Sequence, residues 1–181
     1  MTTEVLDIID TAVKIGLGAL ISGVTTYYIT NINHKKDTEK ELQKRKLNII
    51  EDAVTLINEH FSAFTSLISV IDGVRKSNPK RQKLDLTIDA DKVSWDFLYE
   101  HDNIYCNSRK QEEFATSKLE LIGLSDVTKT LDPLCDIDTK VRSMVIFNKE
   151  IPSDELLDIW RQSIRKVKKD FFQEISNNYK S

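Results

Sequence analysis

The sequence predicts an all-α protein, with a single N-terminal transmembrane helix followed by a cytoplasmic bundle of about four to six helices. Three observations support this class. The 181 residues include only five glycines and three prolines while 30% are charged, a balance typical of helical proteins. Residues 15–33 carry no charge, and the apolar residues that follow them recur at heptad spacing. Uncharged runs of that length and heptad repeats both indicate long helices.

The uncharged run IGLGALISGVTTYYITNIN is the predicted membrane anchor, which we place at residues 11–33 after a short outer tail at residues 1–10. A helix needs about 20 apolar residues to cross the hydrocarbon layer. The tail is acidic, whereas a cleaved signal peptide begins with positive charge, so the anchor is expected to stay in the protein. The alternative is a buried helix of a soluble bundle, because such helices are also almost continuously apolar.

A basic juxtamembrane segment follows at residues 34–46, while Lys14 is the only basic residue before the run. Cytoplasmic flanks of membrane helices are enriched in Lys and Arg, which predicts a single-pass protein of the cytoplasmic (plasma) membrane with its N-terminus outside and C-terminus inside. Each basic side chain near an anionic lipid surface gains about 1 kcal/mol. The expected lipid headgroup contacts are Lys35, Lys36, Lys40, Lys44, Arg45 and Lys46.

Small residues recur at a spacing of four within and beside the anchor. Small side chains on one helix face let two membrane helices approach closely, although such pairs are frequent by chance in spans rich in Gly and Ala. The predicted helix-association face consists of Ala12, Gly16, Gly18, Ala19, Ser22 and Gly23.

A long helix is predicted from about residue 38 to residue 75, as the first helix of a cytoplasmic domain at residues 47–181. Its a and d positions over four heptads are Leu47/Ile50, Val54/Ile57, Phe61/Phe64 and Ile68/Ile71. Ala53, Leu67 and Val74 add an apolar column at the g position, which is wider than the seam of a two-stranded coiled coil. The pattern therefore favours packing inside a bundle, with a parallel coiled coil between protomers as the alternative.

The next elements are predicted from their capping signals. Residues 76–89 are polar and indicate a surface loop or edge strand. Asp91 is the expected N-cap of a short helix that ends at a turn at Asp102 and Asn103. Another helix is expected at residues 107–122, with Gly123 at the C′ position.

The C-terminal part is predicted to contain a broken helix and a well-marked final helix. Ser125 is the expected N-cap of the first piece, and Pro133 should break it before a second piece that reaches about residue 148. Ser153 is the expected N-cap of the final helix. The outer face of this helix is expected to be solvated or to touch anionic lipid or an acidic partner, and it carries Arg161, Arg165, Lys168 and Lys169.

Catalytic, cofactor and metal signatures are absent from the sequence, so no catalytic residue, cofactor site or metal site is predicted. Cys106 and Cys135 are expected to be small packing residues, and His34, His60 and His101 lack metal-ligand spacing. The nearest approaches to a constellation are acidic groups that serve equally well as helix caps: Asp89/Asp91, Asp136/Asp138, Glu112/Glu113, and Glu100 and Asp102 beside His101.

These features favour a non-enzymatic, membrane-tethered interaction protein that self-associates or holds a protein partner at the cytoplasmic face. The expected partners are membrane lipid and either a second copy or another protein, with no nucleic acid and no small-molecule substrate. The alternative is a membrane-perturbing effector, holin-like or toxin-like, whose span lines a pore with polar side chains such as Ser22, Thr25 and Thr26. An enzyme is the third class.

Overall fold

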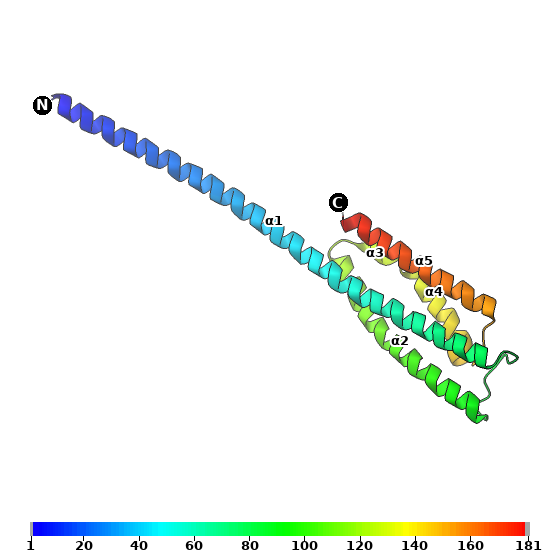
Figure 1. The fold of residues 1–181 in the computed structure, drawn as a ribbon. Coiled ribbons are helices and arrows are strands. Elements are labelled where there is room, and N and C mark those ends of the chain that lie inside the picture. The colour runs from blue at the N-terminus through cyan, green and yellow to red at the C-terminus, as the bar shows by residue number, and fades with distance from the viewer. Residues whose placement is uncertain (1, 180–181) are drawn as a thin grey trace. The chain divides into compact units, whose positions relative to one another are not determined.

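The computed structural model describes the backbone of residues 2–179 and the side chains of residues 22–34 and 36–178. These residues form helices and connecting turns with no β-strand among them, which confirms the predicted all-α class. The chain divides into two compact units between Leu47 and Asn48. Figure 1 shows the order of the helices.

Helix α1 spans Thr2–Ser77 and contains both the predicted anchor and the predicted heptad helix. It ends where the sequence changes to Ser, Asn and Pro, and the amide of Asn78 donates to the carbonyl of Val74 at 3.1 Å. In the first unit, each described side chain from Ser22 to Lys46 is exposed. That part of α1 therefore lacks the buried stripe that the second unit shows.

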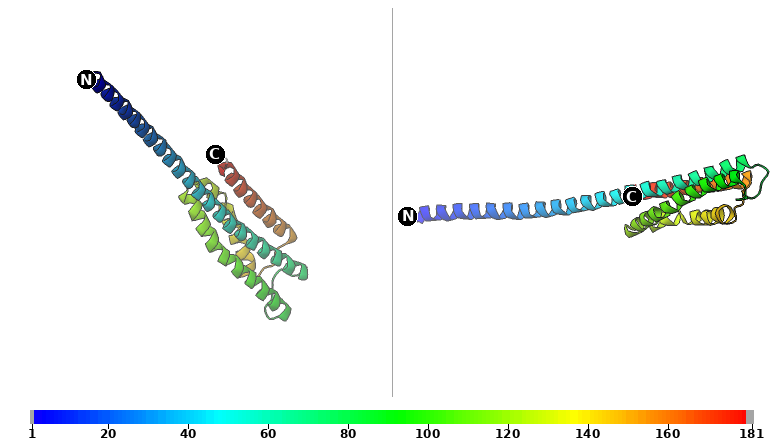
Figure 2. Two further views of the ribbon diagram at one scale, coloured as in Figure 1. Left: turned by 60° about the vertical axis from the view of Figure 1, so that its left-hand side comes forward. Right: turned by 90° about the horizontal axis from the view of Figure 1, so that it is seen from below.

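In the second unit, the heptad stripe of α1 forms the centre of the core. Five a and d residues are buried to within 1% of full burial: Ile57, Phe61, Phe64, Ile68 and Ile71. The predicted third column, Ala53, Leu67 and Val74, is buried as well. Within the chain, Phe64 stacks on Tyr105 of α2 and Phe61 lies 6.5 Å from Phe171 of α5 between ring centroids. Figure 2 shows the ribbons of α2 and α5 beside this part of α1, so the predicted intramolecular bundle is confirmed.

Helix α2 spans Asp89–Leu121 without a break, so the prediction of two helices separated by a turn at Asp102 and Asn103 was wrong. Asp102 is buried and accepts hydrogen bonds from Arg142 instead of making a local turn. The predicted N-cap role of Asp91 was also wrong, because the helix begins two residues earlier. The buried Asp91 carboxylate instead accepts a bond from the amide of Asp85 at 2.9 Å and pairs with Arg81.

The segment between α1 and α2 is an extended surface loop with one short antiparallel contact. The amide of Leu84 donates to the carbonyl of Lys149 at 2.9 Å, and the amide of Ile151 donates to the carbonyl of Gln82 at 2.8 Å. This loop therefore lies along the segment that precedes α5, which agrees with the predicted loop or edge strand.

Gly123 ends α2 in the predicted left-handed conformation, with φ at +86°. The amide of Leu124 donates to the carbonyl of Leu119, and the amide of Gly123 to the carbonyl of Glu120, which together form a Schellman motif. Helix α3 spans Ser125–Lys129, and its N-cap is Leu124 without a side-chain bond, so the predicted cap at Ser125 was wrong.

The predicted break at Pro133 is confirmed. Helix α4 spans Asp132–Val141 with the proline in its first turn, where the missing amide hydrogen costs nothing. It continues as a π-helical segment, η1, over Arg142–Phe147. Single π-helical turns are often found at functional sites, and this one carries the arginine that pairs with Asp102.

Helix α5 spans Asp154–Tyr179. The Ser153 hydroxyl accepts a hydrogen bond from the amide of Leu156 at 3.2 Å, which confirms the predicted N-cap. The prediction for the basic face needs correction at Arg161, which is half-buried and pairs with Asp72 of α1 at 2.8 Å and with Asp158 at 3.2 Å. Arg161 therefore fastens α5 to α1.

Candidate functional site

The predicted helix-association face lies mostly outside the described side chains. This holds for Ala12, Gly16, Gly18 and Ala19, whose helical backbone alone is described. Ser22 and Gly23 are described and exposed. A Cβ atom added to Gly23 would meet no atom within 4 Å. This part of the face is therefore open to a neighbouring helix.

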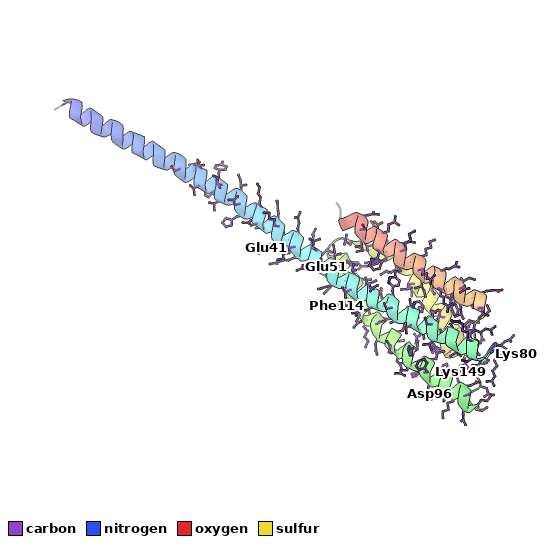
Figure 3. All side chains as sticks on the ribbon, viewed as in Figure 1. Glu41, Glu51, Lys80, Asp96, Phe114 and Lys149 are labelled. Carbon is purple, nitrogen blue, oxygen red and sulfur yellow. The ribbon has the colours of Figure 1, made fainter. Side chains whose placement is uncertain are left out.

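The predicted lipid-contact residues lie on the same exposed part of α1, except that Lys35 falls outside the described side chains. Lys36, Lys40, Lys44, Arg45 and Lys46 are all exposed. Arg45 lies 4.0 Å from Glu41, which Figure 3 labels, and both side chains are about three quarters exposed. An ion pair so exposed contributes little to stability, so these cations are available to an anionic surface.

One described helix is long and apolar enough to cross a membrane by length and composition, the part of α1 from Ser22 to Ser77. In its most apolar window, 39% of the residues are buried inside the protein. Since every described residue from Ser22 to Lys46 is exposed, that buried share comes from the bundle part of the helix. The membrane role of residues 15–33 therefore rests on their sequence.

A second candidate site is a buried polar cluster where α1, α2 and α4 meet. His60 of α1 is 3% exposed, and its Nδ1 lies 2.8 Å from the hydroxyl of Ser108 on α2. The Ser108 hydroxyl donates to the carbonyl of Tyr105 at 2.6 Å. Because a hydroxyl has one proton and a carbonyl has none to give, Nδ1 of His60 carries the proton and donates to Ser108. The other ring nitrogen, Nε2, is then the acceptor.

Burial and the nearby guanidinium of Arg109 lower the pKa of His60 to about 4. The imidazole is therefore neutral near pH 7, which suits a ring enclosed by aromatic side chains. The Tyr105 ring stacks on His60 at 5.0 Å and on Phe64 at 4.5 Å between centroids. Burial also raises the pKa of Tyr105 well above its usual range, so its hydroxyl stays protonated.

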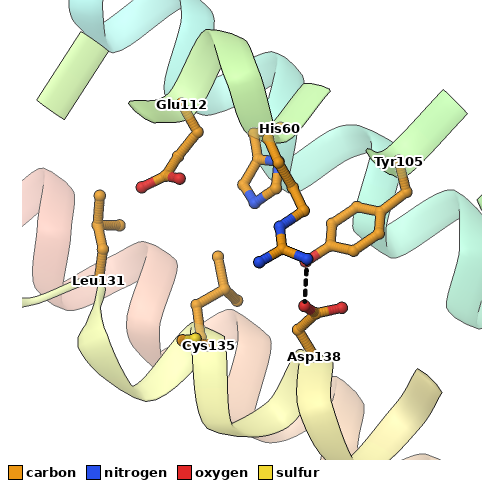
Figure 4. A pocket seen from close by; sticks show the side chains of 8 residues that line it. His60, Tyr105, Glu112, Leu131, Cys135 and Asp138 are labelled. Atoms are coloured by element: carbon orange, nitrogen blue, oxygen red, sulfur yellow. Dashed lines mark ion pairs between the residues drawn. The ribbon is translucent and has the colours of Figure 1, made fainter. Parts of the chain in front are cut away.

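Arg109 and Asp138 join α2 to α4 through an ion pair of 3.2 Å, drawn as a dashed line in Figure 4. Asp138 is buried, and its Oδ1 has no hydrogen-bond partner among the described residues. Burial raises the pKa of this carboxyl, although the charge of Arg109 opposes the shift. The carboxyl is therefore less acidic than an exposed aspartate.

Around this pair lies a cavity of about 80 Å³, into which the side chains of His60 and Glu112 point (Figure 4). Cys135 lines its rim and is exposed, so the prediction that this cysteine packs in the core was wrong. Burial raises the pKa of Glu112. Pockets for small molecules usually enclose about 300–1,000 Å³. The cavity is far smaller, so we interpret the cluster as a polar element of the core.

Comparison of the whole chain with protein families, curated proteins and solved structures found no match. The interpretation of both sites therefore depends on their own chemistry.

The fold brings part of the acidic groups singled out in the sequence together, because Glu112 and Asp138 line the same cavity. Asp102 is buried against Arg142, whereas its neighbour Glu100 is exposed. His101 contacts the carbonyl of Phe97 through Nδ1 at 3.0 Å and does not reach Asp102. Among the described side chains, no three of His, Cys, Asp and Glu lie close enough to share a metal ion.

Sequence reasoning missed the polar cluster, although one signal pointed to it. His60 occupies the same g column as Ala53, Leu67 and Val74, and it is the polar member of that buried column. A polar residue at a core position requires a partner. Its hydrogen-bond partner Ser108 lies 48 residues away on α2, at a distance along the chain where periodicity carries no information.

Proposed function

We propose that the protein is a membrane-anchored, non-enzymatic helical interaction or scaffolding protein, which self-associates or holds a protein partner at the cytoplasmic face of the membrane. The supporting observation is that one unbroken helix, α1, contains both the uncharged run at residues 15–33 and the central core stripe of the bundle. In a chain built in this way, the folded domain is tethered to the environment that residues 15–33 occupy.

The exposure pattern along α1 supports an anchor over a core helix. A core helix of a soluble bundle buries a stripe of side chains that recur every three to four residues, as residues 50–74 do. The described part of the uncharged run instead exposes Val24, Tyr27, Tyr28 and Ile29 to about half or more of their surface. Apolar side chains left uncovered over several turns are explained by a lipid environment.

Tyr27 and Tyr28 add a second argument for the same location. They lie near the end of the run, just before the exposed lysines of the juxtamembrane segment. Tyrosines are enriched at the membrane interface, where the ring contacts acyl chains and the hydroxyl contacts water. The order of apolar run, tyrosines and lysines therefore matches the layers of a membrane from its core to its cytoplasmic surface.

The interaction role is supported by apolar surface that the bundle leaves uncovered. Helix α2 exposes Phe97, Ile104, Phe114 and Leu121 to more than half of their surface. Large apolar side chains that share one exposed helix face are typical of protein interaction surfaces. Two-dimensional confinement raises the effective concentration of tethered domains, so a modest affinity is enough for association.

Crosslinking of the full chain in intact membranes tests this function. Amine-reactive crosslinking should give dimers or a discrete larger complex, and the Leu20→Arg/Val24→Arg double variant should lose them by leaving the membrane. Leu42→Arg/Ile159→Arg is the matched control, because it changes two exposed apolar residues outside the run and should retain the complexes. A chain that stays in the membrane and crosslinks to nothing would contradict the proposal.

A further inference from the structure

Helix α2 exposes six large apolar residues, Val93, Phe97, Tyr99, Ile104, Phe114 and Leu121, and four of them have a symmetric spacing. We define the α2 stripe as Phe97, Ile104, Phe114 and Leu121, which are separated by seven, ten and seven residues. Residues at these intervals lie on one face of a helix and occupy a and d positions of a heptad repeat, with Glu100, Asn107, Gln111 and Lys118 at the a and d positions between them. The order of intervals is the same from either end, with its midpoint at Arg109.

We propose that the α2 stripe is a homotypic interface, on which α2 of a second copy packs antiparallel about a two-fold axis near residue 109. In that arrangement Phe97 lies opposite Leu121 of the second copy, and Ile104 lies opposite its Phe114. All four apolar side chains then meet apolar partners, as an isologous interface requires. The inference rests on the proposed function in one respect: it names the surface through which the protein would self-associate.

Two charged residues of the same face select the antiparallel direction. Glu100 and Lys118 are also symmetric about residue 109, so antiparallel packing places each opposite its counterpart of opposite charge. Parallel packing would place Glu100 against Glu100 and Lys118 against Lys118. Like charges facing each other across a helix pair disfavour that register, whereas opposite charges specify the partner and its direction.

Lys118 is already held in position on this face within the chain. Its ammonium lies 4.6 Å from the centroid of the Phe114 ring and 3.6 Å from a carboxylate oxygen of Asp52 on α1. The exposed Asp52 side chain and the facing Glu100 of the second copy would then share one ammonium. The contacts of Lys118 reduce the entropy that it loses when the second copy binds.

A groove beside the stripe provides the space that Leu121 of the second copy needs. This groove between α1 and α2 encloses about 470 Å³, and Val70, Gly73, Val93 and Phe97 contribute to its lining. Gly73 has no atom within 4 Å of the position its Cβ would take, so the floor of the groove is open. Leu121 is 86% exposed, and the antiparallel register brings it to Phe97, at the edge of the groove.

Cysteine crosslinking of the full chain in mild detergent tests the register. In a Cys106→Ser/Cys135→Ser background, Ile104→Cys with one tag is mixed with Phe114→Cys carrying another, and the mixture is oxidised. The expected result is a disulfide dimer that contains both tags, with little dimer from either variant alone. Dimers of Ile104→Cys with itself, or no dimer in the mixture, would overturn the proposal.

Charge reversal tests the same interface without cysteines at the contact. Glu100→Lys should lower the fraction of chains that crosslink as dimers several-fold, and adding Lys118→Glu should restore that fraction. Gly73→Leu, which places a larger side chain in the groove at a position whose Cβ would meet no atom within 4 Å, should also lower it. If Glu100→Lys/Lys118→Glu and Glu100→Lys crosslink equally, the antiparallel register is wrong. If the chains associate through the anchor alone, the cysteines introduced on α2 stay unlinked. That result would contradict the α2 interface and would leave the proposed function standing.

Discussion

Arg142 holds Asp102 through two hydrogen bonds, from Nε to Oδ1 at 2.9 Å and from Nη2 to Oδ2 at 3.2 Å. The pair joins the middle of α2 to the π-helical segment η1 across 40 residues of sequence. The Asp102 side chain is 3% exposed and that of Arg142 is 21% exposed. The carboxylate is therefore dehydrated and depends on this guanidinium.

Arg142→Met should destabilise the bundle strongly, because it leaves the Asp102 carboxylate buried without a partner. Removing one member of a buried ion pair typically costs about 3–5 kcal/mol, and the partial exposure of Arg142 places the expected loss at about 2–3 kcal/mol. The measurement is urea unfolding of the full chain in mild detergent. The buried Trp160 provides the fluorescence signal.

The double variant Asp102→Leu/Arg142→Met is the matched control for that loss. Replacing both members by apolar residues removes the unpaired charge, and such replacements are often neutral or stabilising. The double variant should therefore be more stable than Arg142→Met alone. Equal losses in the two variants would show that Arg142 acts through other contacts of its guanidinium, such as its position 5.6 Å from the centroid of the Phe147 ring.

The contribution of His60 to stability should fall as the pH is lowered from about 6.5 to about 4, because His60 takes up a proton in the unfolded chain before it does so in the fold. Its pKa is about 6.5 when exposed and is lowered to about 4 in the bundle. Within this window the unfolded state binds more protons, so the free energy of unfolding rises with pH. The slope from one proton is at most about 1.4 kcal/mol per pH unit.

His60→Gln isolates this contribution, since the glutamine amide can still donate to Ser108. The raised pKa values of Glu112 and Asp138 have the opposite sign, because the fold retains protons that the unfolded chain has released. Both carboxyls remain in the variant. The difference in unfolding free energy between the wild type and His60→Gln should therefore increase with pH between about 4 and 6.5. A difference that does not vary with pH would contradict the assignment.

Gly123→Ala and Gly73→Ala should change stability in opposite directions. Gly123 has φ at +86°, and a side chain in the left-handed region costs about 1–2 kcal/mol. Gly73 lies inside α1 with open space at its Cβ position, where alanine gains about 1 kcal/mol over glycine. Urea unfolding of both variants measures whether each substitution lowers or raises the free energy of unfolding. Equal effects would mean that the Gly123 turn relaxes to accept alanine.

The sequence predicted a helix well where the residues that indicate it lie close together along the chain. The core stripe of α1 repeats every three to four residues, and Gly123 and Ser153 act on the helix ends beside them. The break predicted at Asp102 was wrong because aspartate favours turns when its side chain bonds its own backbone. Here the carboxylate bonds Arg142 instead, and a partner 40 residues away leaves no local pattern.

The same limit applies to the polar cluster and to the α2 stripe. Residue types alone do not pair Arg109 with Asp138 or place His60 beside Ser108. The stripe depends on α2 being one helix, because the predicted break separates Phe97 from Phe114. The small-residue face of the anchor stays a prediction, as does the orientation of the chain.

Orientation should depend on the basic juxtamembrane segment. Replacing Lys36, Lys40, Lys44, Arg45 and Lys46 by glutamine removes most of the charge bias from which a cytoplasmic C-terminus is predicted. A C-terminal reporter active only in the cytoplasm should then lose much of its signal. The matched control replaces five exposed lysines of the bundle and should keep the signal: Lys80, Lys92, Lys140, Lys166 and Lys169. Equal loss from the control would point to reporter instability.

Extraction of the membrane fraction with alkaline carbonate tests the anchor most directly. This treatment releases peripheral proteins and leaves spanning helices in the bilayer. We predict that the full chain stays in the pellet, that Leu20→Arg/Val24→Arg moves it to the supernatant with its bundle still folded, and that Leu42→Arg/Ile159→Arg leaves it in the pellet. Release of the wild-type chain by carbonate would contradict the account, because residues 15–33 would then not span a membrane.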